Sequence, residues 1–519
     1  MDTTKDIVPD TAATASDTGP AAGAAPAAPA LPGRWLGYTA VLAASVMDLL
    51  DSTVANVAAP SIRTGLGGSY ADLQWIAAGY TLAMAVALLT GGRLGDVYGR
   101  KRVLLAGVAG FTLSSMLCAT AQTPSMLIVA RIVQGACGAV MLPQGFGLTR
   151  DLFPPQEMKK AWGVFGPLMG LSAVLGPVIA GVLIHADLFG TGWRMIFGIN
   201  LPIGVLALVM GWKYLPDVTP SARGTRLDAA GMALAGSGAF LLVFPLVQGR
   251  ELGWPGWTLA MLGGSLPVLA LFALHQVRRS RAGRMPLVEP SVFTKRAYVS
   301  GVGFAIAFTA SMGGMILTLG VFLQLGLGYS ALHSSLTTAP WALGALFGSA
   351  FGGITMHRLG RRVLQLGLVL MGVGILALYG VFQWAGAGIT HWDFVAPLLI
   401  GGFGMGMIFV PLFDIILNGV EPHEMGSASG TLQSLQQLGM TLGIAVLGTV
   451  FFDILGPSRP GNPAHVAKAL DAASTTALCT AGLIALAFAL AFFLPRTARP
   501  QEEPAAAEEQ APERELVAV

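Results

Sequence analysis

Charged residues are scarce in this sequence. Asp, Glu, Lys and Arg make up 11% of its 519 residues, whereas 54% of the residues are hydrophobic. Soluble proteins carry charge on about a quarter of their residues. The mean hydropathy of +0.67 points the same way. The composition excludes a soluble fold of this size and indicates a chain that lies mostly inside a lipid bilayer.

Cysteine is scarce too, and familiar enzyme motifs are missing. Cys118, Cys137 and Cys479 all fall inside predicted helices, so they indicate neither a disulfide framework nor a metal site. The seven histidines are scattered, and no G-x-x-x-x-G-K-[ST] phosphate loop occurs. We therefore expect no enzyme, no metal or other cofactor and no nucleic-acid partner. An ion gradient is left as the driving force for transport.

What the sequence does contain is a series of long apolar stretches separated by short polar breaks. A membrane-spanning helix needs about 20 apolar residues, and these stretches predict about fourteen such helices in groups of six, two and six. The stretches run over Trp35–Val57, Leu73–Thr90, Val103–Ala121, Met126–Phe146, Ala161–Ile184 and Ile196–Tyr214; then Leu227–Val247 and Trp257–Val277; then Tyr298–Leu323, Leu332–Met356, Val363–Trp384, Phe394–Leu417, Ser427–Phe452 and Ala472–Leu494.

The positive charges are distributed unevenly around these stretches. With both chain ends placed in the cytoplasm, five of the 30 Lys and Arg fall outside and one, Arg131, lies within a helix, so that the remaining 24 face the cytoplasm. Such an excess is typical of the cytoplasmic side of membrane proteins. We expect a multi-pass protein of the plasma (cytoplasmic) membrane with both termini inside.

An internal repeat supports duplicated halves. GGRLGDVYGRKRVL, from Gly91, recurs as GGITMHRLGRRVL, from Gly352, and the alignment matches Gly99 with Gly360 and Arg100 with Arg361. Each copy follows the second helix of a six-helix group. The chain then divides into a disordered cytoplasmic tail (1–33), a six-helix bundle (34–215), two inserted helices with a basic linker (216–296), a second six-helix bundle (297–495) and a disordered acidic tail (496–519).

The first copy of the repeat combines glycines with opposite charges in a short turn. Its residues Gly92, Asp96, Gly99, Arg100 and Lys101 allow Asp96 to meet a neighbouring helix end while the cations stay at the interface. Such a contact can be made and broken when two halves rock, as a gate requires. The segment resembles the signature of the major facilitator superfamily between its second and third helices. A plain positive loop is the alternative.

Arg131 is the single cation predicted near mid-membrane, where an unpaired charge would cost several kcal/mol. Candidate partners are Asp48 and Asp51, three residues apart and hence on one face of the first helix. Desolvation and a nearby guanidinium shift a carboxyl pKa in opposite directions, so substrate arrival could switch the protonation of such a carboxyl. A static ion pair, or an Asp48 that faces water, is the alternative.

The run LDSTVANVAAP, from Leu50, resembles the first-helix signature of the fourteen-helix drug/proton antiporters of the EmrB/QacA type. This resemblance implies that Asp51 is the stronger candidate for the proton site and that Asp48 is an addition. It also implies an all-α major facilitator fold, in which two six-helix bundles surround a cavity and two helices are inserted between them.

The fifth predicted helix is rich in glycine and proline and resembles the antiporter motif of exporters. The residues that carry this resemblance are Gly166, Pro167, Gly170, Gly176, Pro177 and Gly181. The closing Gly-Gly of that motif is Ala180-Gly181 here. Close helix packing without directional meaning is the alternative.

Polar residues elsewhere in the predicted spans are candidates for a substrate or second proton site. They are Asp414, Asn56, Gln134, Gln433 and Gln437. The last two belong to a polar face that either lines a wet cavity or packs against helices, and Asp414 is either a cavity residue or a residue at the cytoplasmic end of its helix.

Together these features predict a proton-coupled efflux antiporter that exports drugs, antibiotics or similar amphiphilic small molecules and works as a monomer. Its partners are then the substrate, protons and the bilayer. The alternatives are a dedicated exporter of one endogenous secondary metabolite, a proton-coupled uptake symporter and a receptor that no longer transports.

Overall fold

The computed structural model describes residues 33–154, 157–187, 190–218, 220, 227–417, 420–421, 424–456 and 463–494. The two predicted tails lie outside this part, apart from Gly33. The described part is all α, as predicted. It contains fourteen helices of seven or more residues: α1 (Arg34–Leu66), α2 (Tyr70–Tyr98), α3 (Arg100–Ala119), α4 (Pro124–Leu152), α5 (Met158–Ala186), α7 (Asn200–Tyr214), α8 (Ala229–Leu252), α9 (Gly256–Arg281), α10 (Arg296–Val321), α11 (Ala331–Leu359), α12 (Arg362–Ala385), α13 (Val395–Ile416), α14 (Met425–Leu455) and α15 (Pro463–Ala491).

These helices correspond to the fourteen predicted stretches, which confirms the predicted fold class. Within the described residues, twelve spans are long and apolar enough to cross a membrane by length and composition. The 29-residue helices α5 and α11 complete the set of fourteen. The sixth stretch is broken into the four-residue α6 (Met195–Gly198) and α7. Pro202, which has no N–H to donate to the preceding turn, lies just after this break.

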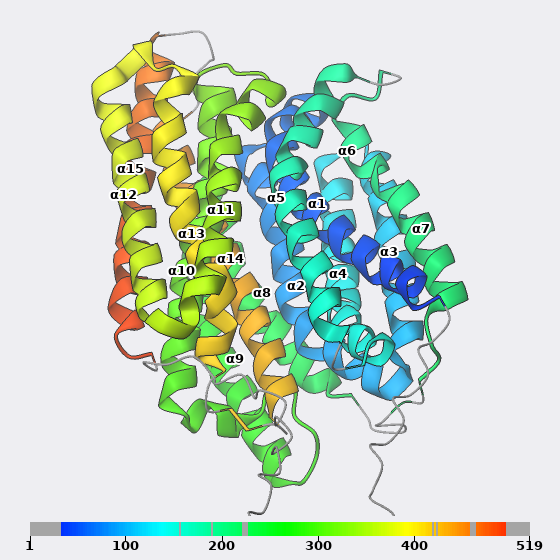
Figure 1. The fold of residues 1–519 in the computed structure, drawn as a ribbon. Coiled ribbons are helices and arrows are strands. Elements are labelled where there is room, and N and C mark those ends of the chain that lie inside the picture. The colour runs from blue at the N-terminus through cyan, green and yellow to red at the C-terminus, as the bar shows by residue number, and fades with distance from the viewer. Residues whose placement is uncertain are drawn as a thin grey trace, which may run out of the picture.

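The helices pack in two sets with the same pattern of contacts. In the first set, α1 contacts α5 and α7, α2 contacts α4, and α3 contacts α4 and α7. In the second set, α10 contacts α14 and α15, α11 contacts α13, and α12 contacts α13 and α15. Each of these five contacts in one set has its counterpart at the same helix positions of the other. Figure 1 shows the blue-to-cyan first set beside the second set, which ends in red.

The two sets meet through reciprocal helix pairs. The second helix of each set contacts the fifth helix of the other, as α2 with α14 and α11 with α5. This is the relationship that a rotation exchanging the two sets would produce. The inserted helix α8 packs on its neighbour α9 and also on α2 and α14, so it lies along one of the two seams.

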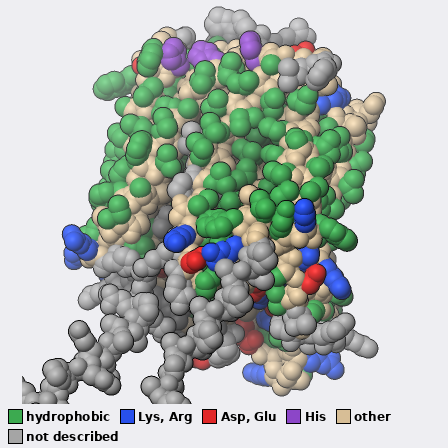
Figure 2. Space-filling model, turned by 45° about the vertical axis from the view of Figure 1, so that its right-hand side comes forward, with side chains coloured by type: hydrophobic (Ala, Val, Ile, Leu, Met, Phe, Trp, Pro, Cys, Tyr) green, Lys and Arg blue, Asp and Glu red, His purple; other side chains and the backbone are tan. Residues whose placement is uncertain are grey.

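The turns of the internal repeat lie at one end of the bundle, which we call the basic end. Gly99 alone joins α2 to α3, with a φ of 93°, and Gly360 ends α11 with a φ of 53°. L-residues with side chains avoid this region, which explains the glycine in both copies. Figure 2 shows Lys and Arg gathered at the lower end, histidines at the upper and a broad apolar band between them. We call the opposite end the far end.

Candidate functional site

The structure brings the predicted mid-membrane charges together inside the first set. Arg131 on α4 donates from Nη1 to Oδ2 of Asp51 on α1. The two residues are 1% and 2% exposed. A guanidinium and a carboxylate sealed from water at this depth stabilise each other, because either one alone would be an uncompensated buried charge.

Two side-chain amides complete the surroundings of Asp51. Gln134 donates from Nε2 to Oδ1 of Asp51 over 2.8 Å, and Asn200 does so from Nδ2 over 2.8 Å. Both amides also donate to the hydroxyl of Ser115, over 2.6 and 3.1 Å. Gln134 is one turn after Arg131 on α4 and accepts from Arg131 Nη1 over 2.7 Å. Four helices thus contribute to one closed polar network.

Asp48 lies beside this network with a different partner. The hydroxyl of Tyr80 on α2 donates to Oδ1 of Asp48 over 2.5 Å. The ring centroid of Tyr80 lies 4.2 Å from the guanidinium carbon of Arg131, an attractive cation–π distance. A Cβ added at Gly138 of α4 would lie 2.7 Å from Oδ1 of Asp48, so this glycine makes room for the carboxyl.

Three residues of this network were not assigned to the site from the sequence: Tyr80, Ser115 and Asn200. Tyr80 and Ser115 stand in ordinary apolar or small-residue runs, and no local spacing connects them to Asp51. For Asn200 the sequence did contain a signal: the nearby Pro202 indicates a break in the helix, and this break lies directly before α7. At this break Asn200 lies at the first position of α7, from which its amide reaches Asp51.

The loop at Gly99 binds other parts of the first set. Arg100 places Nη1 3.2 Å from both oxygens of Asp151, at the end of α4, and lies 3.6 Å from Asp96. Lys101 lies 3.2 Å from Asp217, just after α7. The contact to a neighbouring helix end, predicted for Asp96, is therefore made by Arg100, because the long guanidinium side chain reaches further than a carboxylate.

The second copy of the repeat makes a comparable anchor in the second set. Arg361 donates from Nη1 to the carbonyl oxygens of Phe492 and Leu494, over 2.7 and 3.0 Å, at the end of α15. Lys101 in the first copy and Arg361 in the second therefore tie the start of the third helix to the segment just after the last helix of the same set, whereas Arg100 binds the end of the fourth helix.

The glycines of the predicted antiporter motif let α5 approach two helices closely. A Cβ added at Gly176 would lie 2.2 Å from Oγ1 of Thr53 on α1, and one at Gly181 would lie 2.7 Å from Cα of Leu332 on α11. Pro177 between them is half-buried. Gly166, Pro167 and Gly170 lie within α5, and their surroundings are outside the described part. The motif thus includes a direct contact between the two sets.

The other predicted polar residues occupy different places. Gln437 of α14 donates to the sulfur of Met84 on α2 over 3.1 Å and so lies at the seam between the sets. Gln433 is half-buried, and Asn56 is half-buried with its amide donating to the carbonyl of Ser52 over 2.9 Å. Asp414 is exposed two residues before the end of α13, at the basic end.

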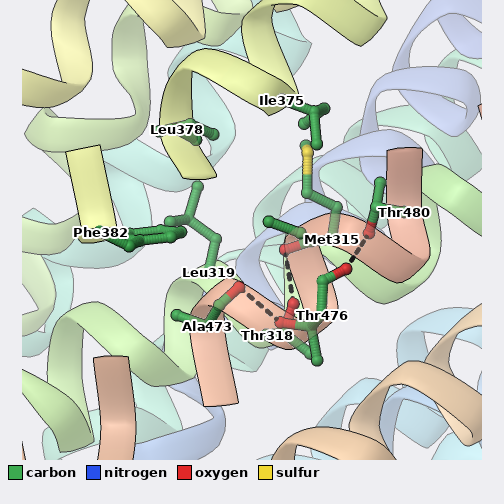
Figure 3. Close-up of a pocket in the computed structure, with 10 residues that line it drawn as sticks. Met315, Thr318, Leu319, Ile375, Leu378, Phe382, Ala473, Thr476 and Thr480 are labelled. Carbon is green, nitrogen blue, oxygen red and sulfur yellow. Dashed lines mark hydrogen bonds between the residues drawn. The ribbon is translucent and has the colours of Figure 1, made fainter. Parts of the chain in front are cut away.

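A small cavity lies away from this site, among α10, α12 and α15 of the second set (Figure 3). Its volume of about 20 Å³ is enough for a single water molecule, whereas drug-sized ligands need at least about 300 Å³. The hydroxyls of Thr318 and Thr476 that line it donate to carbonyls of their own helices. This cavity is a gap in the packing and not a site for a transported drug.

Comparison with known proteins identifies the family. A model of the Major Facilitator Superfamily matches residues 41–444. The chain belongs to this superfamily. It is 47% identical to a probable actinorhodin transporter of Streptomyces coelicolor over 82% of this chain and 73% of that protein. It is 32% identical to a tetracenomycin C resistance and export protein of Streptomyces glaucescens, over 87% of this chain and 84% of that protein.

Solved structures of other transporters share the same fold. A crystal structure of an auto-inhibited POT family peptide transporter aligns with a TM-score of 0.65 and 16% identity, covering 90% of this chain and 99% of that chain. Membership of the superfamily makes the chain a multi-pass membrane transporter of a small molecule and not an enzyme. The predicted resemblance to its drug/proton antiporter branch is also confirmed.

Proposed function

We propose that the chain is a proton-driven antiporter that exports antibiotics or similar amphiphilic small molecules across the cytoplasmic membrane. The observation that carries the proposal is the buried pair of Asp51 and Arg131 in the first set. Ionisable groups inside a membrane protein are costly and mark ion pathways. Asp51 is the group that accepts the driving proton, and Arg131 is the cation that the proton releases from its partner.

Neutralisation of Asp51 would loosen the contact between α1 and α4. Arg131 would then keep the Oε1 of Gln134, the carbonyl of Ile76 and the ring of Tyr80, but not an opposite charge. Because α1 also contacts α10 and α11 of the second set, a shift of α1 would reach both sets. This connection is the route by which proton binding and substrate release are coupled.

The two sets, 34–215 and 297–495, are the bodies that rock against each other in this proposal. Hydrogen bonds join the two sets toward the far end. Gln74 donates to the carbonyl oxygen of Ile444 over 3.1 Å, and Gln324 donates to that of Val57 over 2.9 Å. We assign the basic end to the cytoplasm, with both termini there, by the positive-inside rule. The structure is then closed toward the outside. Residues 216–296 move with the seam between the sets, along which α8 packs. A single copy of the chain is sufficient for transport.

The names of the relatives support the direction and the class of substrate. One is described as a resistance and export protein, and both are named for a single compound. These names favour export over uptake. The complete hydrogen-bond network around Asp51 argues against a receptor that does not transport. The single-compound names favour, as a second candidate, a dedicated exporter of one metabolite.

A resistance profile tests these alternatives. We would express the chain and its Asp51→Asn variant at equal levels in a bacterium that lacks its own efflux pumps, and challenge both with actinorhodin, tetracenomycin C and ethidium. Resistance to several compounds in the parent alone supports multidrug export, and resistance to one supports a dedicated exporter. Greater accumulation in the parent than in the variant would indicate uptake and overturn the proposal.

A further inference from the structure

Asp48 and Asp51 lie one helical turn apart on α1, yet their surroundings differ in kind. Asp51 accepts from a guanidinium and two amides. Asp48 accepts from the hydroxyl of Tyr80, and no cation of the described part forms an ion pair with it. Both carboxyls are buried, at 9% and 2% exposure. One face of α1 therefore carries two buried carboxyls, but only one of them has a cation as its partner.

The charges around the two carboxyls do not balance if both are ionised. Arg131 is the one cation that faces them among the described residues, and it is bound to Asp51. The other titratable neighbours are Tyr80 on α2 and Cys118 on α3, whose sulfur lies 3.6 Å from Oε1 of Gln134. Neither supplies a positive charge. An ionised Asp48 would leave a net negative charge sealed at mid-membrane, which is strongly unfavourable.

We propose that Asp48 is a second proton-binding carboxyl, separate from the Asp51–Arg131 pair, and that it holds a proton in this conformation while Asp51 is ionised. The proton sits on Oδ2, because Oδ1 accepts the hydroxyl of Tyr80. Binding forms one O–H bond on the carboxylate and release breaks it, so no other reactant is needed. Tyr80 acts as a positioning residue that fixes the Asp48 carboxyl. This inference rests on the proposed proton coupling and divides that role between two groups.

Infrared spectroscopy of the purified full chain in lipid nanodiscs at pH 7 tests the proposal, because a protonated carboxyl has a C=O stretching band that a carboxylate lacks. Exposed carboxyls are ionised at this pH. Two further buried acids of the described part are held ionised by partners. Burial raises the pKa of Asp228, but hydrogen bonds from His275, Gly231 and Gln276 bring it below its usual value. Hydrogen bonds from Lys295 and Ser291 lower the pKa of Glu424.

The parent is expected to show a protonated carboxyl band that Asp48→Asn loses. The double variant Asp51→Asn/Arg131→Gln should keep the band, because it removes both charges of the ion pair and leaves Asp48 without a cation. Tyr80→Phe should keep the band but shift its frequency, since the hydrogen bond to Oδ1 is gone while the ring remains. This variant also serves if Asp48→Asn fails to fold, which the amide bands of the same spectrum would report. A parent without the band, or a band that survives in folded Asp48→Asn, overturns the proposal. No substrate is involved, so a chain that fails to export drugs still gives a result.

Discussion

The guanidinium carbon of Arg131 lies 4.2 Å from the ring centroid of Tyr80, while the hydroxyl of that tyrosine is bound to Asp48. One side chain of α2 thus touches both the cation that serves Asp51 and the second carboxyl. Tyr80 thus connects Asp48 and Asp51, which lie on the same face of α1 but share no hydrogen-bond partner.

The two contacts of Tyr80 can be separated by mutation. We expect Tyr80→Leu to lower the free energy of unfolding by about 2 kcal/mol more than Tyr80→Phe, because phenylalanine keeps the ring beneath Arg131 and leucine does not. Thermal unfolding in detergent, followed by circular dichroism, measures the difference. Equal losses in the two variants would show that the ring does not stabilise Arg131.

The ion pair predicts non-additive effects on stability. Arg131→Gln leaves Asp51 buried without its cation and should destabilise the protein by about 3–5 kcal/mol. The double variant Asp51→Asn/Arg131→Gln removes both charges and should recover much of this loss. Thermal unfolding of the parent, the two single variants and the double variant completes the cycle. If the double variant loses the sum of the two single losses, the residues are not a coupled pair.

Neighbouring glycines at the end of α2 predict opposite outcomes. A Cβ at Gly91 would lie 2.3 Å from the backbone oxygen of Ala139 on α4, whereas one at Gly92 would meet nothing closer than 3.9 Å. Gly91→Ala should therefore separate α2 from α4, with a loss of about 1–3 kcal/mol and of drug resistance. Gly92→Ala is the matched control for packing and should leave the free energy of unfolding near that of the parent. Comparable effects of the two substitutions would contradict the packing.

Substitution of Gly181 should change the separation of α5 and α11 and not only the stability of the protein. Its added Cβ would press on the backbone of Leu332, so Gly181→Ala should hold α5 and α11 apart at the far end. Spin labels on the exposed positions Val182 and Leu336, with the native cysteines replaced, should report a longer distance than in the parent. Gly163→Ala is the control, because nothing lies within 4 Å of its added Cβ. An unchanged distance in Gly181→Ala would contradict closure through this contact.

The sequence predicts most of the architecture because its signals are local. Fourteen apolar stretches, the repeated loop and the glycines at 99 and 360 are each readable within about 20 residues, and each has its element in the structure. The pairing of Arg131 with Asp51 was one of two open choices, since both carboxyls lie on one helix face. The contacts of Tyr80, Ser115 and Asn200 depend on how four helices pack. No spacing along a single helix reveals that arrangement.

The reach of Arg100 to Asp151 shows the same limit. The loop sequence identifies a group of charges that can form contacts, but 51 residues separate this pair. Which of the charges meets a helix end is set by side-chain length and by the position of α4. Neither can be read from the loop alone.

Proton movement in everted membrane vesicles tests the central claim most directly. After energisation, addition of a drug to which the parent confers resistance should dissipate the proton gradient in parent vesicles and leave it intact in Asp51→Asn vesicles. Asp453→Asn, which neutralises an exposed carboxyl of α14, is the matched control and should behave as the parent. Equal proton movement in parent and Asp51→Asn vesicles would remove Asp51 from the coupling mechanism.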